Sequence, residues 1–286
     1  MEPIRIDREY VAARIPPRRA DSHKGMNGRA AIVGGSRIYH GAPFHAAMAA
    51  LRTGLDLVYL AVPSVVATPI RALSPDLIVI PLPDSKLTRG NANRLTSWLP
   101  ALDSIGVGPG LGPQNPEELL HALTRLSTKS KTLVVDADAL RPTILPAAEK
   151  FPIIVTPHHG EFERLFGAKV EGDLPALVAL VAEKAKASKM TVLLKGPVDI
   201  ISDGERVGLN ETHSPAMTTG GTGDVLTGIV TGLSAKGIPP FEAACCAAYL
   251  NGCAGLEAAK SVGLHMIASD VVEQLPLVMR AFDRIV

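Results

Sequence analysis

Short apolar segments alternate with helical patterns along most of the chain, and this alternation is the strongest constraint on its fold. Segments such as "LVYLAVP" (57–63) and "TLVV" (132–135) are apolar at consecutive positions, so both faces of each strand must be covered. Helical patterns such as "APFHAAMAALRTG" (42–54) and "PEELLHALTRLS" (116–127) lie between such segments. The order predicts an α/β protein, with a mostly parallel sheet between two layers of helices.

Size and charge limit the number of domains and the kinds of partner that this chain can have. The 286 residues show no linker or repeat, so we expect one domain over 1–286 with an N-terminal arm over 1–26. A formal net charge of +1 gives no strong attraction to nucleic acid or an anionic membrane. No apolar run approaches the roughly 18 residues of a membrane span, and the N-terminus has no secretory signal. Three cysteines without C-x-x-C spacing indicate buried thiols in a reducing cytoplasm.

Glycines and charged residues follow several of the predicted strands. Ligands of parallel α/β sheets bind beyond the carboxyl ends of the strands, so these residues are expected to meet at one edge of the sheet. The segments concerned are Gly34-Gly35-Ser36, Gly108-Pro109-Gly110, Asp136 to Asp138, His158 to Glu161, and Lys195-Gly196.

The segment "TTGGTGDVLTG" (218–228) joins a glycine-threonine run to an apolar helix. Glycines expose backbone N–H groups, and a helix N-terminus adds unpaired donors and partial positive charge. The pattern therefore predicts a phosphate site, with Asp224 as either a helix N-cap or a base beside the phosphate. The Walker A motif is absent, and "GPGLG" lacks the spacing of a dinucleotide fingerprint.

Other candidate residues have plainer interpretations. His158 suits a ligand contact or a solvated turn, and Lys195 suits a phosphate contact or an exposed position. Asp136 and Asp138, two residues apart, suit a metal pair or the end of a strand. A zinc site of His158 with Glu161 lacks further ligands at useful spacing.

Six segments occur in the same order as in a known family. They are "NGRAAIVGGSRIYHGAPFHAAMAALRTG", "GVGPGLG", "VVDADAL", "VTPHHGEFERLFG", "LLKGPVDII" and "SPAMTTGGTGDVLTGIVTGL". The late "GTGD" resembles the ribokinase-like superfamily, and the six together resemble its NAD(P)H-hydrate dehydratase family from about residue 27 to residue 260. The resemblance implies a ribokinase-like three-layer α/β/α sandwich with a mostly parallel central sheet.

The resemblance also implies an activity. The family repairs hydrated NADH and NADPH (NADHX and NADPHX), in which water has added at C6 of the nicotinamide ring. It phosphorylates the C6 hydroxyl with ADP or ATP, aided by Mg²⁺, and phosphate then leaves. A cytoplasmic homotetramer and a separate epimerase partner are implied too, since no epimerase domain precedes the matching region.

The resemblance assigns roles by position. Asp224 matches the base that contacts the hydroxyl, and Gly221, Thr222 and Gly223 match the cradle for the phosphoryl group. Glu161 matches the acidic residue that places magnesium, and Asp136 is the second candidate ligand. The substrate positions are Ala42, Gly110, His158 and Asp224, and the nucleotide positions are Lys195, Gly196, Pro197, Val198, Asp199 and Gly223.

Two positions depart from the family pattern. Asp199 stands where threonine is usual, and Arg141 stands where asparagine is common. Both bear on the choice of nucleotide more than on the reaction. The sequence leaves two alternatives: a superfamily kinase that phosphorylates a vitamin-precursor alcohol and stops there, and a non-catalytic nucleotide sensor.

Overall fold

The structure, a computed structural model, describes residues 2–83 and 86–286 and contains one large sheet in this part of the chain. Its ten strands lie in the order β1-β10-β9-β8-β7-β6-β5-β2-β3-β4. The pairs around β9 are antiparallel, and the other pairs are parallel, as predicted. The strands are β1 (Ile4–Arg5), β2 (Arg29–Val33), β3 (Leu57–Pro63), β4 (Ile78–Leu82), β5 (Ser104–Val107), β6 (Thr132–Val135), β7 (Ile153–Val155), β8 (Thr191–Leu194), β9 (Asp199–Ser202) and β10 (Val207–Asn210).

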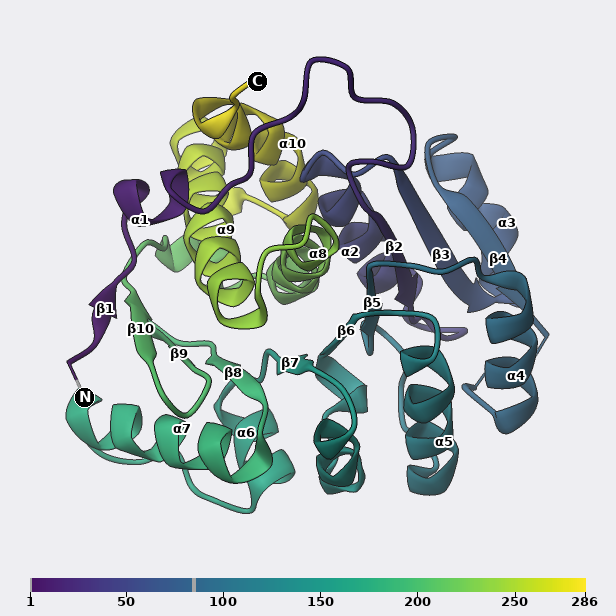
Figure 1. Cartoon of the computed structure of the whole chain (residues 1–286), viewed down its shortest axis with the longest axis horizontal. Helices are drawn as coiled ribbons and strands as arrows, with labels where there is room; N and C mark the ends of the chain where they lie inside the picture. Colours follow the sequence, from purple (N-terminus) through teal and green to yellow (C-terminus); the bar gives the residue numbers. More distant parts are fainter. Residues whose placement is uncertain (1, 84–85) are drawn as a thin grey trace.

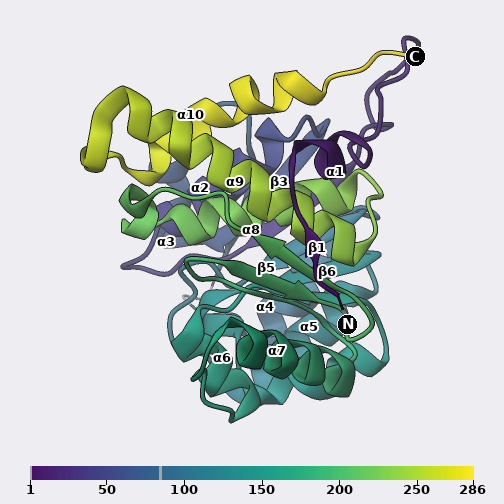
Figure 2. The ribbon, with the colours of Figure 1, turned by 90° about the vertical axis from the view of Figure 1, so that its left-hand side faces the viewer.

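Helices cover both faces of the sheet and complete three layers (Figures 1 and 2). One layer contains α1 (Arg8–Ala12), α2 (Gly41–Arg52), α3 (Ser64–Leu73), α8 (Thr222–Ala235), α9 (Pro240–Val262) and α10 (Ala268–Met279). The other contains α4 (Arg89–Trp98), α5 (Pro116–Ser127), α6 (His159–Phe166) and α7 (Leu174–Ser188). Alternate residues of β2 supply the two cores: Ala31 and Val33 face one layer, whereas Ala30 and Ile32 face the other.

The structure adds elements to those expected from sequence. The predicted arm, whose residue 1 lies outside the described residues, contributes α1 and also β1, which pairs with β10. Strand β10 and helices α3, α4 and α10 are further additions. Of the three free cysteines, Cys245 and Cys246 are buried, and Cys253 is partly buried.

The order of the strands reverses between β2 and β5. The chain runs outward from β2 to β3 and β4, then returns to place β5 on the other side of β2. At such a reversal the following helices diverge to opposite faces and leave a crevice beyond the strand ends. The crevice lies beside Gly34 and Gly110, where ligand contacts were expected.

Close packing between α2 and α8 fixes the start of α8 above this crevice. A Cβ at Gly228 would lie 2.1 Å from the carbonyl oxygen of Ala46, so only glycine allows this approach. Helix α2 directly follows β2, and α8 therefore presents its first turn close to the strand ends.

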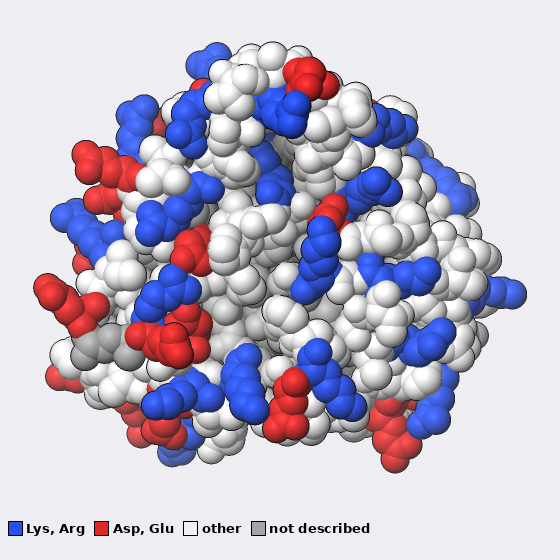
Figure 3. All heavy atoms as spheres, in the orientation of Figure 1, with Lys and Arg blue, Asp and Glu red and all other residues white. Residues whose placement is uncertain are grey.

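The opposite end of α8 borders a different hollow. A cavity of about 380 Å³ lies under the N-terminal arm and is lined by Pro16 to Arg19, Asp103, Lys131 and Ser234 to Gly237, among others. Figure 3 shows a hollowed face on which both signs of charge are mixed. Within residues 2–83 and 86–286, no helix combines the length and hydropathy needed to span a bilayer.

Candidate active site

The glycine-threonine run forms a backbone cradle at the start of α8. Gly221 precedes the helix with φ +99°, a left-handed conformation, and a Cβ there would lie 2.7 Å from the Cβ of Ala268. The Thr222 hydroxyl lies 2.8 Å from the Met217 carbonyl oxygen and 3.1 Å from that of Thr219, which ties the loop to the helix. The first N–H groups of α8 have no partner within the helix, so they can bind an anion.

Asp224 is the third residue of α8, and Gly221 is the N-cap, so the N-cap interpretation of Asp224 is wrong. Its carboxylate has no hydrogen bond within the part of the chain that the structure describes. Burial raises its pKa to about 7, and nearby Asp136, Glu161 and Asp138 add to this effect although Lys195 opposes it. A carboxylate with a pKa near neutrality suits a general base.

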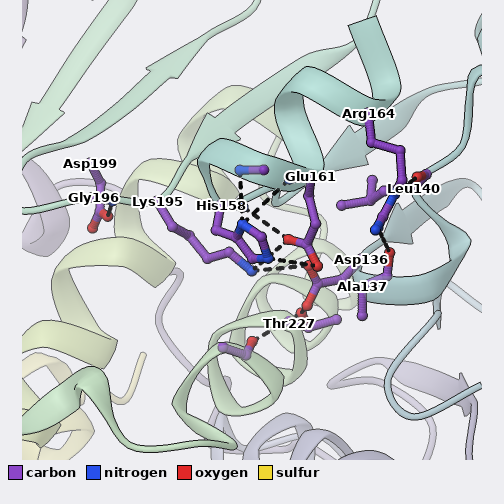
Figure 4. Close-up of polar contacts among 12 residues, drawn as sticks. Asp136, Ala137, Leu140, His158, Glu161, Arg164, Lys195, Gly196, Asp199 and Thr227 are labelled. Carbon is purple, nitrogen blue, oxygen red and sulfur yellow. Dashed lines mark hydrogen bonds and ion pairs between the residues drawn. The ribbon is translucent and has the colours of Figure 1, made fainter. Parts of the chain in front are cut away.

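Lys195, directly after β8, lies at the centre of a charge cluster (Figure 4). Its Nζ is 3.1 Å from Asp136 Oδ1 and 3.6 Å from Glu161 Oε2. Burial lowers the pKa of Lys195, but the attraction of Asp136, Glu161 and Asp224 outweighs this and raises the pKa above its ordinary value. A Cβ at Gly223 would lie 3.4 Å from this Nζ, so the ammonium group reaches the backbone cradle itself.

Asp136 connects this cluster to α8. Its side chain is only 2% exposed and accepts a hydrogen bond of 2.5 Å from the Thr227 hydroxyl, one turn after Gly223. Asp138 points elsewhere and accepts from the Gly112 N–H at 2.8 Å. The residue between them, Ala137, has φ +52°, which turns the two carboxylates apart. Asp136 and Asp138 therefore do not converge on one metal ion.

Arg164 of α6 holds this strained turn. Its guanidinium donates to the carbonyl oxygens of Ala137 at 3.0 Å and Leu140 at 3.1 Å (Figure 4). A positive φ at alanine is costly and persists only where its surroundings enforce it. Arg164 thus keeps Asp136 directed at Lys195.

His158 and Glu161 form a reciprocal capping box at the start of α6. His158 Nδ1 accepts from the Gly160 and Glu161 N–H groups at 3.1 and 3.3 Å, and Glu161 accepts from the His158 N–H at 2.9 Å. The His158 side chain is 61% exposed, and its Nε2 lies 3.5 Å from Glu161 Oε1. Across the residues that the structure describes, no group of three or more His, Cys, Asp or Glu side chains is arranged to hold a metal.

Two cavities flank the first turn of α8. The larger, about 480 Å³, is lined by Lys195, Gly196, Pro197, Asp199, Thr212 to Pro215, Met217, Thr218, Thr222, Gly223, Leu226, Ala248, Asn251 and Gly252. The smaller, about 290 Å³, is lined by Ile38 to Ala42, His45, Gly220, Gly221 and Asp224. The backbone cradle therefore separates two compartments, and Lys195 lines one while Asp224 lines the other.

The predicted binding residues fall largely into these two compartments. Ala42 and Asp224 line the smaller cavity, and Gly110 lies beneath it, since a Cβ at Gly110 would be 3.2 Å from the Ala42 Cβ. Four of the predicted nucleotide residues from 195 to 199 line the larger cavity, and Val198 is not among its lining residues. His158 lines neither cavity.

Asp199 has a structural role that the sequence did not reveal. Its oxygens accept hydrogen bonds from the Gly196 N–H at 3.1 Å and from Asn210 Nδ2 at 2.9 Å. Burial raises its pKa although both hydrogen bonds oppose this. The carboxylate is therefore held in place to close the turn from Lys195 to Asp199. Arg141, the other departure, donates to the Asp138 carbonyl oxygen at 3.3 Å.

Several lining residues were missed by the sequence argument. Tyr39, His40 and Gly220 lie in segments already quoted as motifs, so their positions gave a usable signal. His45 lies in one of these segments too, and burial lowers its pKa. Asn251 lies inside a small-residue helix, and no local pattern distinguished it.

The fold and the site together place the chain in the ribokinase-like class. Its marks are a three-layer sandwich, a glycine-rich helix start at the carboxyl edge of the sheet, and a carboxylate in the first turn of that helix. Within that class, the family model for NAD(P)H-hydrate dehydratase matches residues 30–277, and the chain belongs to this family.

Relatives and solved structures agree with this placement. The chain is 49% identical to an ADP-dependent (S)-NAD(P)H-hydrate dehydratase of Nitrosopumilus maritimus, over 95% of each chain. It is 44% identical to a bifunctional NAD(P)H-hydrate repair enzyme of Pyrobaculum aerophilum, over 93% of this chain and 53% of the relative. The solved ADP/ATP-dependent NAD(P)H-hydrate dehydratase of Bacillus subtilis, co-crystallised with ATP and Mg²⁺, is 29% identical with a TM-score of 0.86, over 99% of this chain and 100% of the other.

Proposed function

We propose that this chain is a nucleotide-dependent NAD(P)H-hydrate dehydratase, a lyase that restores NADH and NADPH from their hydrates with ADP as the phosphoryl donor. The observation that carries the proposal is the position of Asp224, an unpaired carboxylate in the first turn of α8 between two cavities. A base placed there can act on a hydroxyl in the smaller cavity while a phosphoryl group enters from the larger one.

The reaction follows from the chemistry of the leaving group. Hydroxide leaves poorly, so the enzyme first converts the C6 hydroxyl into a phosphate ester. Asp224 takes the hydroxyl proton as the oxygen bonds to phosphorus, and the bond from the terminal phosphorus to the bridging oxygen of the donor breaks. The C6–O bond then breaks, phosphate leaves, and loss of a proton from the adjacent ring carbon restores the double bond.

The N–H groups of Gly221, Thr222 and Gly223 are proposed to stabilise the transferring phosphoryl group. Helix α8 directs its unpaired donors and partial positive charge at the same point. Lys195 reaches this cradle from the nucleotide side, so we assign it contact with the transferring group as well as with the bound nucleotide. The turn from Gly196 to Asp199 would then hold the rest of the nucleotide. Ala42, Gly110 and His158 are proposed to surround the hydrated nicotinamide.

Asp136 and Glu161 fit a magnesium site in part. Mg²⁺ usually takes one or two carboxylates, with phosphates and waters as its other ligands, and these two carboxylates are the ones that converge on Lys195. When bound, the ion would neutralise charge on the phosphates. Because Lys195 already occupies the space between the carboxylates, we propose that Glu161 contacts magnesium through water.

The bifunctional relative supports cooperation with an epimerase, which we propose is a separate protein for this chain. We also propose a cytoplasmic homotetramer. The tetramer is supported by apolar side chains that are exposed in the single chain and that a subunit contact would bury. They are Ile38 and Tyr39 beside the smaller cavity, and Ile267 next to α10. Light scattering in solution tests the tetramer.

The decisive test of function is recovery of reduced-nicotinamide absorbance from NADHX and NADPHX, with phosphate release measured in parallel for ADP and ATP. We expect one phosphate and one shortened nucleotide for each NAD(P)H restored. A stable phosphorylated alcohol without absorbance recovery would instead identify a small-molecule kinase.

A further inference from the structure

The smaller cavity contains an imidazole that the chain leaves unpaired. His45 of α2 is half-buried and lines this cavity together with Asp224. Within residues 2–83 and 86–286, its ring nitrogens form no hydrogen bond or ion pair, and neither nitrogen is enclosed by the protein. Burial lowers the pKa of the ring from its ordinary 6.5, so the imidazole is neutral at physiological pH and can accept a proton.

The ring of His45 lies between the start of α2 and the backbone cradle. A Cβ at Gly41 would be 3.9 Å from its Nε2, and a Cβ at Gly221 would be 3.6 Å from its Cδ2. Long side chains of a helix lean toward the helix N-terminus, and His45 therefore directs Nε2 at the first turn of α2. That turn carries Ala42, so the imidazole lies beside the proposed site of the hydrated nicotinamide.

The proposed reaction releases two protons in each turnover. Asp224 takes the proton of the C6 hydroxyl during phosphoryl transfer, so it still holds this proton when elimination begins. Loss of phosphate then requires a second acceptor, for a proton on C5, the ring carbon next to C6. Apart from Asp224, the cavity is lined by two groups that can accept a proton near neutral pH, His40 and His45. His40 is exposed, whereas His45 is half-buried against the cradle.

We infer that His45 is a further catalytic residue, which removes the C5 proton during the elimination step. The electron pair of the C5–H bond becomes the C5=C6 double bond, and the electron pair of the C6–O bond leaves with phosphate. The proton binds to His45 Nε2, and the imidazolium then loses it to water. This inference rests on the proposed function, and it gives the two steps separate bases, Asp224 for phosphorylation and His45 for elimination.

Single-turnover measurements on the wild type and His45→Gln test the inference with ADP and NADHX. Formation of AMP reports phosphorylation, and recovery of reduced-nicotinamide absorbance reports elimination. We expect His45→Gln to form AMP at close to the wild-type rate but to restore absorbance about 100-fold more slowly, since a positioned base contributes on the order of 10²–10⁴ in rate. The phosphorylated hydrate should accumulate. His45→Ala should show the same loss, and added imidazole should restore elimination by occupying the vacated space.

His121→Gln is the matched control, because His121 is also a half-buried histidine on a helix, α5, and should leave both steps unchanged. Recovery of absorbance at the wild-type rate in His45→Gln would overturn the inference and leave the departing phosphate as the proton acceptor. An equal loss of both steps without rescue by imidazole would also overturn it, because His45 would then serve binding or packing. A wild type that forms AMP without restoring absorbance would refute the proposed function itself, whereas neither result with the variants would.

Discussion

Replacing Asp224 with asparagine should lower turnover and, at high pH, raise the free energy of unfolding. Burial, with Asp136 and Glu161 nearby, raises the pKa of Asp224 from its ordinary 3.8 to about 7. The folded protein therefore binds this proton more tightly than the unfolded chain does. The associated stability is present below about pH 4 and is lost as the pH rises toward 7.

The size of this effect follows from the two pKa values. At about 1.4 kcal/mol for each pH unit, the ionised carboxylate costs the fold up to about 4 kcal/mol above pH 7. Asparagine has the shape of the neutral acid and never pays this cost. Asp224→Asn should therefore be more stable than the wild type at pH 8–9, and the difference should fade as the pH drops toward 4.

Turnover should move in the opposite direction. Asparagine cannot accept the hydroxyl proton, and a positioned general base contributes on the order of 10²–10⁴ in rate. In the wild type, turnover should fall as the pH drops through about 7, because Asp224 must be ionised to act. Urea unfolding at pH 5 and pH 8.5, combined with absorbance recovery from NADHX over the same range, measures both effects.

Asp270 provides a matched control, since it is also the third residue of its helix and accepts the Ile267 N–H at 2.8 Å. Asp270→Asn should lose a few tenths to about 1 kcal/mol of stability and leave turnover unchanged. If Asp224→Asn instead destabilises the fold at high pH, the electrostatic explanation fails. If it keeps turnover within about tenfold of the wild type, the base assignment fails.

Three further predictions concern the surroundings of the cradle. Lys195→Ala should weaken ADP binding, measured by calorimetry, and should also lower turnover by about 100-fold or more, because the lysine Nζ reaches Gly223. An effect on binding alone would show that Lys195 contacts the nucleotide only in the ground state. His158→Ala should lower the free energy of unfolding by about 1 kcal/mol, because it removes the helix cap. His158→Asn should keep the cap, so a change in its Michaelis constant for NADHX would show that the imidazole ring contacts the substrate. A non-transferable ADP analogue should bind without restoring NAD(P)H, and dehydration without phosphate release would contradict phosphorylation before elimination.

The sequence predicted the sheet well because its signal is local. Segments such as β2 and β8 are apolar at every position after the first, and this pattern has few competing interpretations. Helices α3 and α10 were missed because each contains an internal proline, Pro69 or Pro276, which argues against a helix unless packing overrides it.

The candidate site was predictable where motifs ended strands, and less so where distant segments met. Asp224, Lys195 and Asp136 were all identified from their positions. That Lys195 would pair with Asp136, or that Thr227 would hold that carboxylate, depends on contacts across 59 and 91 residues. Asn251 belongs to the same category, because its position in the wall of the larger cavity follows only from the folded arrangement of α9 and the loop around Thr212.

The charge balance of the site connects these residues to the proposed magnesium ion. Asp136, Glu161 and Asp224 surround one ammonium group, so the fully ionised cluster carries an excess of negative charge before a nucleotide binds. A polyphosphate would add to that excess, and the donors of α8 compensate only part of it. For the proposed reaction, a Mg²⁺ ion beside Asp136 and Glu161 would supply the positive charge that balances a bound ADP. Burial keeps the pKa of Asp224 high and Asp136 and Glu161 add to this effect, so the carboxylate resists ionisation in the free site, and once ionised it is a strong enough base for the proposed proton transfer from the bound hydroxyl.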